Sequence, residues 1–342
     1  MSQLETKALS YRVIIEPLGL LYGSSGRFLS PDNLVGRSGT HFPPSAATLS
    51  GIFADTLTKE KRLEDLRLLQ LAGPFWGDEK QSLYVPTPFN CLVKDKKIKY
   101  YLTWDLQKWQ GEDEADKYES GTWFPLTAWE KLQTNPQELS VMSPPWQFLP
   151  HLHPRLKEDE RHTKKGDLFL ENGVQLDQDT YLVYLSNTKI EEGWYRFGGE
   201  GHLVNLRCEN IDEPLKTLLN QPLGHSFVLI TPAVWGSNRL SYRAPEQDKE
   251  GNLYWSKIPV TALLTQRPQP TRYRLGKYKQ EVKDSTPKIL SRGRYAIPAG
   301  SVYFLEKPLH ENWHQLSDSL FPTEGVSLKR WGCGLALPIA SE

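Results

Sequence analysis

One pattern of residue types occurs twice in this chain, in the same order, and it constrains the fold more than any single motif. Each half opens with an apolar segment that ends in a proline and a Gly-Ser pair: RVIIEPLGLLYGSSGRFL from Arg12 and FVLITPAVWGSNRL from Phe227. Each half closes with Glu-Gly, basic and aromatic residues, a Gly-x-Gly turn and an alternating segment: EGWYRFGGEGHLVNLRC from Glu192 and EGVSLKRWGCGLALPIA from Glu324. A tandem duplication of one βαββαβ unit would produce this order, and chance similarity of apolar strands is the alternative.

The duplication predicts an α+β fold with two domains, each an antiparallel sheet with helices on one face. The 342 residues are enough for two domains of ordinary size. We place the first domain at residues 1–213 and the second at 214–342, with the boundary near residues 213–224. The sequence is polar and irregular from about 94 to 165, which predicts long loop insertions carried on the first domain.

Helical periodicity appears at two places in the first half. One helix is predicted to begin near Pro44 and Ser45, and its apolar face consists of Leu49, Ile52, Phe53 and Leu57. A second helix is predicted over residues 61–73, KRLEDLRLLQLAG, which ends in a glycine.

The composition indicates a folded protein of balanced charge. Forty-one basic and 41 acidic residues give a net charge of zero, so any basic surface is local. The three cysteines are far apart, which fits a reducing compartment, and no signal peptide or membrane-spanning segment is recognisable. We therefore expect a cytoplasmic protein without a membrane partner. Eleven tryptophans and 15 tyrosines suggest rings at interfaces as well as in the core.

The familiar catalytic motifs are missing from the sequence. There is no P-loop, no H-E-x-x-H, no paired C-x-x-C and no G-x-S-x-G, and the GGEGHL segment precedes a strand instead of a helix. His151, His153 and His162 form a cluster in a proline-rich segment, where a solvated loop is a better interpretation than a metal site. We expect no catalytic residues, no metal and no cofactor.

Both glycine turns have basic and aromatic neighbours, which is the composition of a single-stranded RNA site. Glycine allows close approach of the backbone, cations hold phosphates, and a ring offers a stacking face. The alternative is that the glycines only permit tight strand packing. The predicted RNA-binding residues of the first turn are Arg196, Gly198, Gly199, Gly201 and Arg207. Those of the second turn are Lys329, Arg330, Trp331, Gly332 and Gly334.

Further basic residues are concentrated in one segment. Residues 267–294 contain nine Lys or Arg against Glu281 and Asp284, so the charge is 9 − 2 = +7, and a polyanion is the natural partner. A solvated basic loop is the alternative. The predicted RNA-binding residues of this segment are Arg272, Arg274, Lys277 and Arg294. Those in the loop after the first strand of each half are Arg27, Arg37 and His41 in the first half and Arg239 in the second.

Several segments match one known family in the same order: IIEPLGLLYGSSGRF, PPSAATLSGIFADTL, GPFWG, LYVPTPFNCLV, FGGEGHLVNL, VLITPAVW and IPAGSVYFLE. The chain resembles the subunit of the type III-B (Cmr) CRISPR effector complex that sits at the 5′ end of the crRNA. That subunit is a member of the repeat-associated (RAMP) RNA-binding superfamily. The resemblance covers the chain apart from about 94–165, and GGEGHLVNL and PAGSVYFLE are its most specific parts.

The resemblance implies tandem ferredoxin-like, RRM-related domains and a non-catalytic role in antiviral defence. Its implied partners are the 5′ tag of the crRNA, the large signature subunit, the backbone RAMP subunit and, indirectly, the target RNA. The family often has a Gly-Trp-Asp stretch before the Pro-Ala-Gly-Ser strand, whereas this chain has LGKYKQEVKDSTPKILSRGRYA there. The resemblance therefore implies no surface for this stretch in the present chain.

Two other functions compete with this one. Some members of the superfamily are metal-independent endoribonucleases that process repeat RNA, and His41 with Tyr22 would be the candidate acid–base pair. The third interpretation is a purely structural adaptor, whose tryptophans and tyrosines contact proteins and which scarcely touches RNA.

Overall fold

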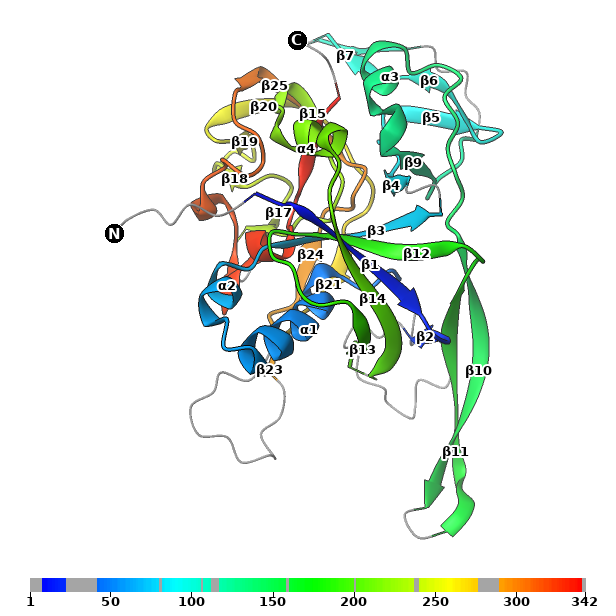
Figure 1. The fold of residues 1–342 in the computed structure, drawn as a ribbon. Coiled ribbons are helices and arrows are strands. Elements are labelled where there is room, and N and C mark those ends of the chain that lie inside the picture. Colours follow the sequence, from blue (N-terminus) through cyan, green and yellow to red (C-terminus); the bar gives the residue numbers. More distant parts are fainter. Residues whose placement is uncertain are drawn as a thin grey trace.

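The computed structural model describes residues 8–22, 42–79, 82–105, 107–111, 117–157, 160–199, 201–236, 240–275 and 289–339. For residues 22, 152–157, 160–171, 274–275 and 289–290 it describes the backbone only. Within these residues the fold is α+β, with mostly antiparallel sheets and few helices, as the sequence predicts. Figure 1 shows the arrangement of the elements.

The first sheet has seven strands. Their spatial order is β13 (Gly193–Phe197), β14 (His202–Asn210), β1 (Tyr11–Pro17), β12 (Thr180–Ser186), β3 (Leu71–Asp78), β4 (Leu83–Pro86) and β9 (Trp123–Pro125). Its central four strands lie side by side in the order β14-β1-β12-β3. Numbered by their order along the chain, these are the fourth, first, third and second strands, and each neighbouring pair is antiparallel.

The second sheet has six strands, and its central part repeats the same order. The strands are β18 (Glu246–Gln247), β19 (Leu253–Trp255), β20 (Ile258–Leu264), β25 (Val302–Leu309), β15 (Gly224–Leu229) and β28 (Ala336–Pro338). Here β28-β15-β25-β20 are again the fourth, first, third and second strands, all paired antiparallel. The two halves of the chain therefore share one strand order. The prediction of helices on one face of each sheet is not met in the second half, because the described residues between β15 and β28 contain no α-helix.

Helices cover one face of the first sheet. They are α1 (Ala46–Lys59) and α2 (Leu63–Leu68), and α1 begins after Ser45, as predicted. Leu49, Ile52, Phe53 and Leu57 are buried against alternate residues of β1, β12 and β14, including Val13. The opposite face of the sheet, at Ile14 and Val183, belongs to a core that continues into the second half. Two cores on opposite faces follow from the period-two alternation of the strands.

The prediction of a helix over residues 61–73 is wrong after Leu68. The chain leaves α2 at Leu69, and residues from Leu71 onward form β3. Gly73 lies inside this strand with φ of +133°, and a Cβ there would lie 2.8 Å from the Tyr184 ring. Burial of Leu71 and Ala72 between two cores overrides their helical propensity.

The insertion between β4 and β12 contains more regular structure than predicted. Its elements are β5 (Cys91–Lys94), β6 (Lys97–Tyr101), β7 (Thr103–Trp104), β8 (Trp109–Gln110), η1 (Leu126–Ala128) and α3 (Trp129–Thr134). They are followed by β10 (Trp146–Lys157) and β11 (Glu160–Leu176), which pair with each other, and β11 also pairs with β2 (Leu21–Tyr22). The β10–β11 ribbon extends beyond the rest of the molecule in Figure 1. It contains His151, His153 and His162, which were predicted to lie in a loop.

The remaining elements are short and belong mostly to the second half. They are α4 (Glu213–Asn220), β16 (Trp235–Gly236), β17 (Ser241–Tyr242), β21 (Gln269–Thr271), β22 (Arg274–Leu275), β23 (Ile289–Leu290), β24 (Arg294–Ala296), η2 (Asp318–Leu320), β26 (Thr323–Glu324), β27 (Val326–Ser327) and η3 (Leu328–Trp331). Helix α4 lies between the two units, and Asp212 caps it by accepting a hydrogen bond from the Leu215 N–H at 2.9 Å.

Candidate nucleic-acid interface

The first glycine turn joins β13 and β14 at the edge of the first sheet. Along β13, Tyr195 and Phe197 face the core beneath α1, so Trp194 and Arg196 point to the opposite face, which is open at this edge of the sheet. Trp194 is 74% exposed, and it lies directly opposite Asn205 of β14. Leu203 of β14 is opposite Arg196 and is 46% exposed. An exposed ring beside a guanidinium group is therefore present at this edge.

The turn itself is accessible. Gly198 and Gly201 have φ of +74° and +69°, a conformation that favours glycine. The Gly201 N–H donates to the Gly198 carbonyl at 3.3 Å, and the Arg196 Nη1 donates to the Gly201 carbonyl at 3.5 Å. Gly198 and Gly199 are exposed. The structure thus brings Arg196, Gly198, Gly199 and Gly201 together in one turn at the edge of the sheet.

Arg207 lies on the same open face, but its charge is already balanced. Its Nη2 and Nη1 donate to Glu16 at 2.7 Å and to Glu209 at 3.2 Å. Glu16 also accepts a hydrogen bond from the Asn205 amide at 3.0 Å. Arg196 has no such carboxylate among the residues described, so it is the cation of this turn that can take a phosphate without breaking an ion pair.

The second glycine turn lies inside the molecule, which corrects the prediction that it contacts RNA. The Lys329 ammonium donates to the carbonyls of Leu316 at 2.6 Å and His314 at 3.0 Å, and it pairs with Asp318 at 3.3 Å. Burial lowers the pKa of Lys329, although Asp318 opposes that effect. Lys329 is therefore a structural cation.

Arg330 joins the two halves of the chain. Its Nη2 donates to the Leu66 carbonyl at 2.6 Å and its Nε to the Leu69 carbonyl at 3.0 Å. These two carbonyls end α2, so the arginine supplies the donors that the end of that helix lacks. Burial is the main cause that lowers the pKa of Arg330, and the nearby Arg67 adds to it.

The other residues of the second turn are also used in packing. A Cβ on Gly332, whose φ is +70°, would lie 2.5 Å from the Ala72 Cα, and one on Gly334 would lie 2.8 Å from the Trp235 ring. Trp331 is partly buried and its ring centroid is 5.2 Å from that of Tyr273. We therefore remove Lys329, Arg330, Trp331, Gly332 and Gly334 from the predicted RNA-binding set.

The basic segment divides into buried and exposed residues. Arg294 is buried and forms an ion pair with Glu324 at 2.7 Å, so it also leaves the RNA-binding set. Arg272 is exposed at the end of β21, and Arg274 is described in its backbone only. The predicted residues Arg27, Arg37, His41, Arg239 and Lys277 lie outside the described residues.

The sequence interpretation missed two exposed rings, Trp194 and Tyr295. Tyr295 is 57% exposed on β24. The alternation in GWYRF could have identified Trp194, because Phe197 and Tyr195 set which face is inside. For Tyr295 the signal was weaker, because β24 has only three residues.

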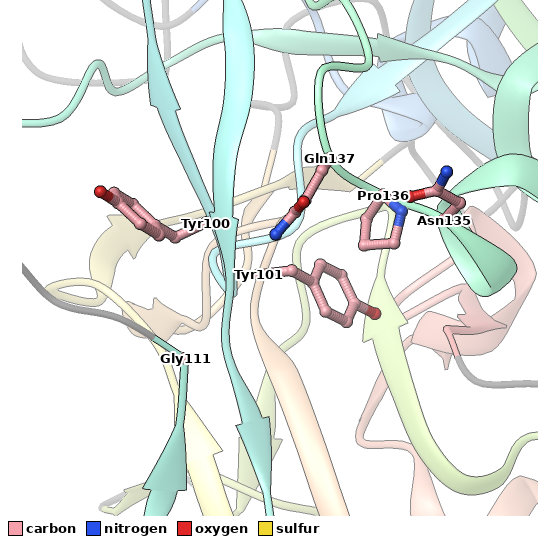
Figure 2. A pocket seen from close by; sticks show the side chains of 6 residues that line it. All are labelled: Tyr100, Tyr101, Gly111, Asn135, Pro136 and Gln137. Atoms are coloured by element: carbon pink, nitrogen blue, oxygen red, sulfur yellow. The ribbon is translucent and has the colours of Figure 1, made fainter.

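A shallow hollow of about 230 Å³ lies in the insertion and is lined by Tyr100, Tyr101, Gly111, Asn135, Pro136 and Gln137. In Figure 2 the Tyr101 ring lies on the side of Pro136 and Gln137, while the Tyr100 ring points away. The Tyr101 hydroxyl donates to the Ile339 carbonyl at 3.1 Å and so links the insertion to the second half. None of the described residues that line the hollow is charged, so among them there is no cation to bind a phosphate.

The described part of the chain contains no group of three His, Cys, Asp or Glu residues placed to hold a metal ion. Among its helices, none is long and apolar enough to cross a membrane.

Comparison with known proteins identifies the family. The model of the CRISPR-associated protein family Cas_Cmr3 matches residues 27–340. This match defines the α+β chain described above as a CRISPR-associated protein. The chain belongs to the Cas_Cmr3 family, which confirms its resemblance to the Cmr subunit. No curated protein sequence matches the chain.

Solved structures of type III CRISPR complexes contain similar chains. One is the cryo-EM structure of type III-B Cmr-beta bound to cognate target RNA and AMPPnP, with 14% identity, a TM-score of 0.48 and 86% of each chain covered. The Csm3-Csm4 subcomplex of a type III-A interference complex has 12% identity and a TM-score of 0.39, covering 88% of this chain and 97% of that chain. The Csm1-Csm4 cassette with AMPPNP has 10% identity and a TM-score of 0.36, covering 89% and 98%.

Proposed function

We propose that the protein is a non-catalytic subunit of a type III-B CRISPR RNA-guided effector complex. In this role it binds the 5′-tag region of the crRNA and joins the large signature subunit to the backbone RAMP filament, so that it meets target RNA only indirectly. The observation that carries the proposal is the family match over residues 27–340, because it includes the second sheet, six of the seven strands of the first sheet and both glycine turns. Cleavage chemistry is assigned to other subunits.

The strand order supports the corresponding fold. Both halves have central strands in the order fourth, first, third, second, with antiparallel pairing throughout. This is the order of a βαββαβ unit, so we infer tandem ferredoxin-like domains. In the first unit α1 lies between the first and second strands, whereas the described residues between β12 and β14 form strand β13 in place of the second helix of such a unit.

The first turn supports contact with RNA. Trp194 offers a ring for a base, and Arg196 offers a cation for a phosphate two residues further along the same face. The turn glycines allow a backbone to approach closely. The same edge also exposes Leu18 and Leu203, which suits a subunit that has protein neighbours.

The test is binding of the full chain to a short RNA that carries a repeat-derived 5′ tag, against a scrambled RNA, at two salt concentrations. One arm contains the large subunit and the other lacks it. We expect preference for the tag, no cleavage, and weaker binding at higher salt because bound phosphates release counterions. Trp194→Ala is expected to weaken binding about 10-fold, whereas Arg67→Gln, on the exposed surface of α2, serves as the control.

Absence of tag preference in both arms would contradict the proposal and leave a structural adaptor. Cleavage of the RNA at the repeat would instead favour the endoribonuclease.

A further inference from the structure

A second surface with a ring and cations lies on the short β21–β24 ladder, in the part of the chain where the sequence departs from the family pattern. Pro270 pairs with Tyr295 and Thr271 with Arg294. The side chain of Arg294 points inward. Its Nε and Nη2 donate hydrogen bonds to the Glu324 carboxylate at 3.0 and 2.7 Å, and its Nη1 donates to the Gly236 carbonyl at 3.2 Å. Because neighbouring residues of a strand face opposite sides, Tyr295 points outward.

Arg272 lies on the same outer face. The pairing of Thr271 with Arg294 places the next residue, Arg272, opposite Gly293. A Cβ on Gly293 would lie 3.2 Å from the Arg272 Nε and 3.4 Å from its Nη2, so the guanidinium lies against a residue that has no side chain. Gly293 and Tyr295 are two residues apart, which puts the guanidinium and the ring side by side along the strand.

The ladder is fixed from below. The Tyr295 N–H donates to the Ser241 Oγ at 3.1 Å, and the buried pair of Arg294 with Glu324 holds the strand on its inner side. These contacts hold the backbone that carries the Tyr295 ring, so little ordering of the backbone is needed when a partner binds.

The charged residues of the ladder are all positive. Residues 267–275 and 289–296 contain five arginines and no acidic residue. Arg267, Arg272 and Arg292 are exposed, and among the side chains described in these two segments Arg294 is the one paired with a carboxylate. Phosphates can approach Arg272 and Arg292 without displacing an ion pair.

We propose that the outer face of β21–β24 is a single-stranded RNA contact, in which one base stacks on Tyr295 and one flanking phosphate lies against Arg272, while a second phosphate lies against Arg292, which is exposed just before β24. The proposal rests on the function proposed above and adds a second RNA contact to the one at the first turn. Stacking on a ring takes any base, and the cations hold the backbone, so this contact is tolerant of sequence.

An acidic surface of a partner protein would satisfy the arginines as well, but it would not require the ring. A protein contact of that kind depends on charge, whereas RNA uses both the face of Tyr295 and the cations beside it. Substitutions that separate the ring from the charge therefore distinguish the two partners.

The experiment measures the affinity of the full chain for tagged RNA over a range of salt concentrations. Tyr295→Ala is expected to weaken binding about 10-fold at every salt concentration, and Tyr295→Phe, which keeps the ring, to bind like the wild type. The double variant Arg272→Gln, Arg292→Gln is expected to lower the slope of log K against log salt by about 1.4, since each phosphate contact contributes about 0.7 for a single strand. Arg67→Gln is the control for an exposed arginine elsewhere, and thermal unfolding of each variant checks folding.

The outcomes separate this inference from the proposed function. If the wild type binds tagged RNA and the Tyr295 and arginine variants bind like it, this surface does not contact RNA, while the proposed function stands. If Tyr295→Ala and Tyr295→Phe bind RNA as tightly as the wild type, and the arginine variants instead bind the large subunit more weakly, the partner is an acidic protein and the inference is overturned. If the wild type binds no RNA with or without the large subunit, the proposed function fails, and this inference fails with it.

Discussion

At the scale of single residues, the two glycine turns have the same composition and different surroundings. Gly198 lies at the surface, where the nearest atom to an added Cβ is the Thr48 methyl at 3.8 Å. Gly332 lies against the backbone of β3, with the Ala72 Cα at 2.5 Å and the Leu71 carbonyl at 2.9 Å. The sequence pattern cannot distinguish these cases, because Gly332 is surrounded by residues far away in the chain (332 − 72 = 260 positions for Ala72).

The first prediction concerns these two glycines. Gly332→Ala is expected to lower the free energy of unfolding by about 2–4 kcal/mol, because a left-handed residue gains a Cβ that clashes with a strand. Gly198→Ala, with a similar φ and open space, is expected to cost about 1 kcal/mol. Urea denaturation measures both, and equal losses would contradict the assignment of the second turn to packing.

The second prediction concerns His314. Burial lowers the pKa of this imidazole from 6.5 to about 4, and the positive charge of Lys329 adds to the effect. The unfolded chain therefore takes up a proton between these two pH values that the folded chain does not, so the stability from this residue is present above pH 6.5 and lost as the pH falls toward 4. At pH 5 the loss should reach about 2 kcal/mol.

Urea denaturation at pH 7 and pH 5 measures this loss. His314→Gln removes the titration, so the variant should lose less stability than the wild type over the same interval. Parallel losses in the two proteins would show that other groups cause the whole pH dependence.

At the scale of elements, the best-predicted helix is the one whose pattern agrees with its burial. Helix α1 begins after Ser45 and buries the apolar face that its spacing defines. Helix α2 shows the opposite case, because the leucines that suggest a longer helix are taken by β3. Local spacing indicates neither that these leucines belong to β3 nor that Arg330 donates hydrogen bonds to the last carbonyls of α2.

The third prediction follows from that contact. Arg330→Ala leaves the Leu66 and Leu69 carbonyls without their charged donor and is expected to cost about 2 kcal/mol of unfolding free energy. Arg67→Ala removes an exposed pair with Glu64 on the same helix and should have no measurable effect. If both variants unfold at the same urea concentration, the second turn does not hold α2.

At the scale of the whole molecule, the duplicated pattern was the most informative feature of the sequence. It predicted an α+β chain of antiparallel sheets, and both sheets have the strand order of one repeated unit. The domain boundary stays a prediction. The polar insertion was the weakest part, because the β10–β11 ribbon and α3 depend on pairing and burial that polar composition does not indicate.

The candidate site was predicted only in part, for a physical reason. Composition identifies where cations are frequent, but burial decides which of them remain available. Arg294 and Lys329 carry the same positive charge as Arg196 and Arg272 and differ in being buried with partners inside the molecule. Exposed rings such as Trp194 become recognisable only when the face of the strand is known.

The central claim is that this chain covers the 5′ tag of the crRNA. It is tested most directly by nuclease protection of the crRNA in effector complexes reconstituted with and without the chain. We predict that the tag nucleotides are protected only when the chain is present, while protection of the guide region by the backbone subunits is unchanged. Identical protection of the tag in both complexes would contradict the account.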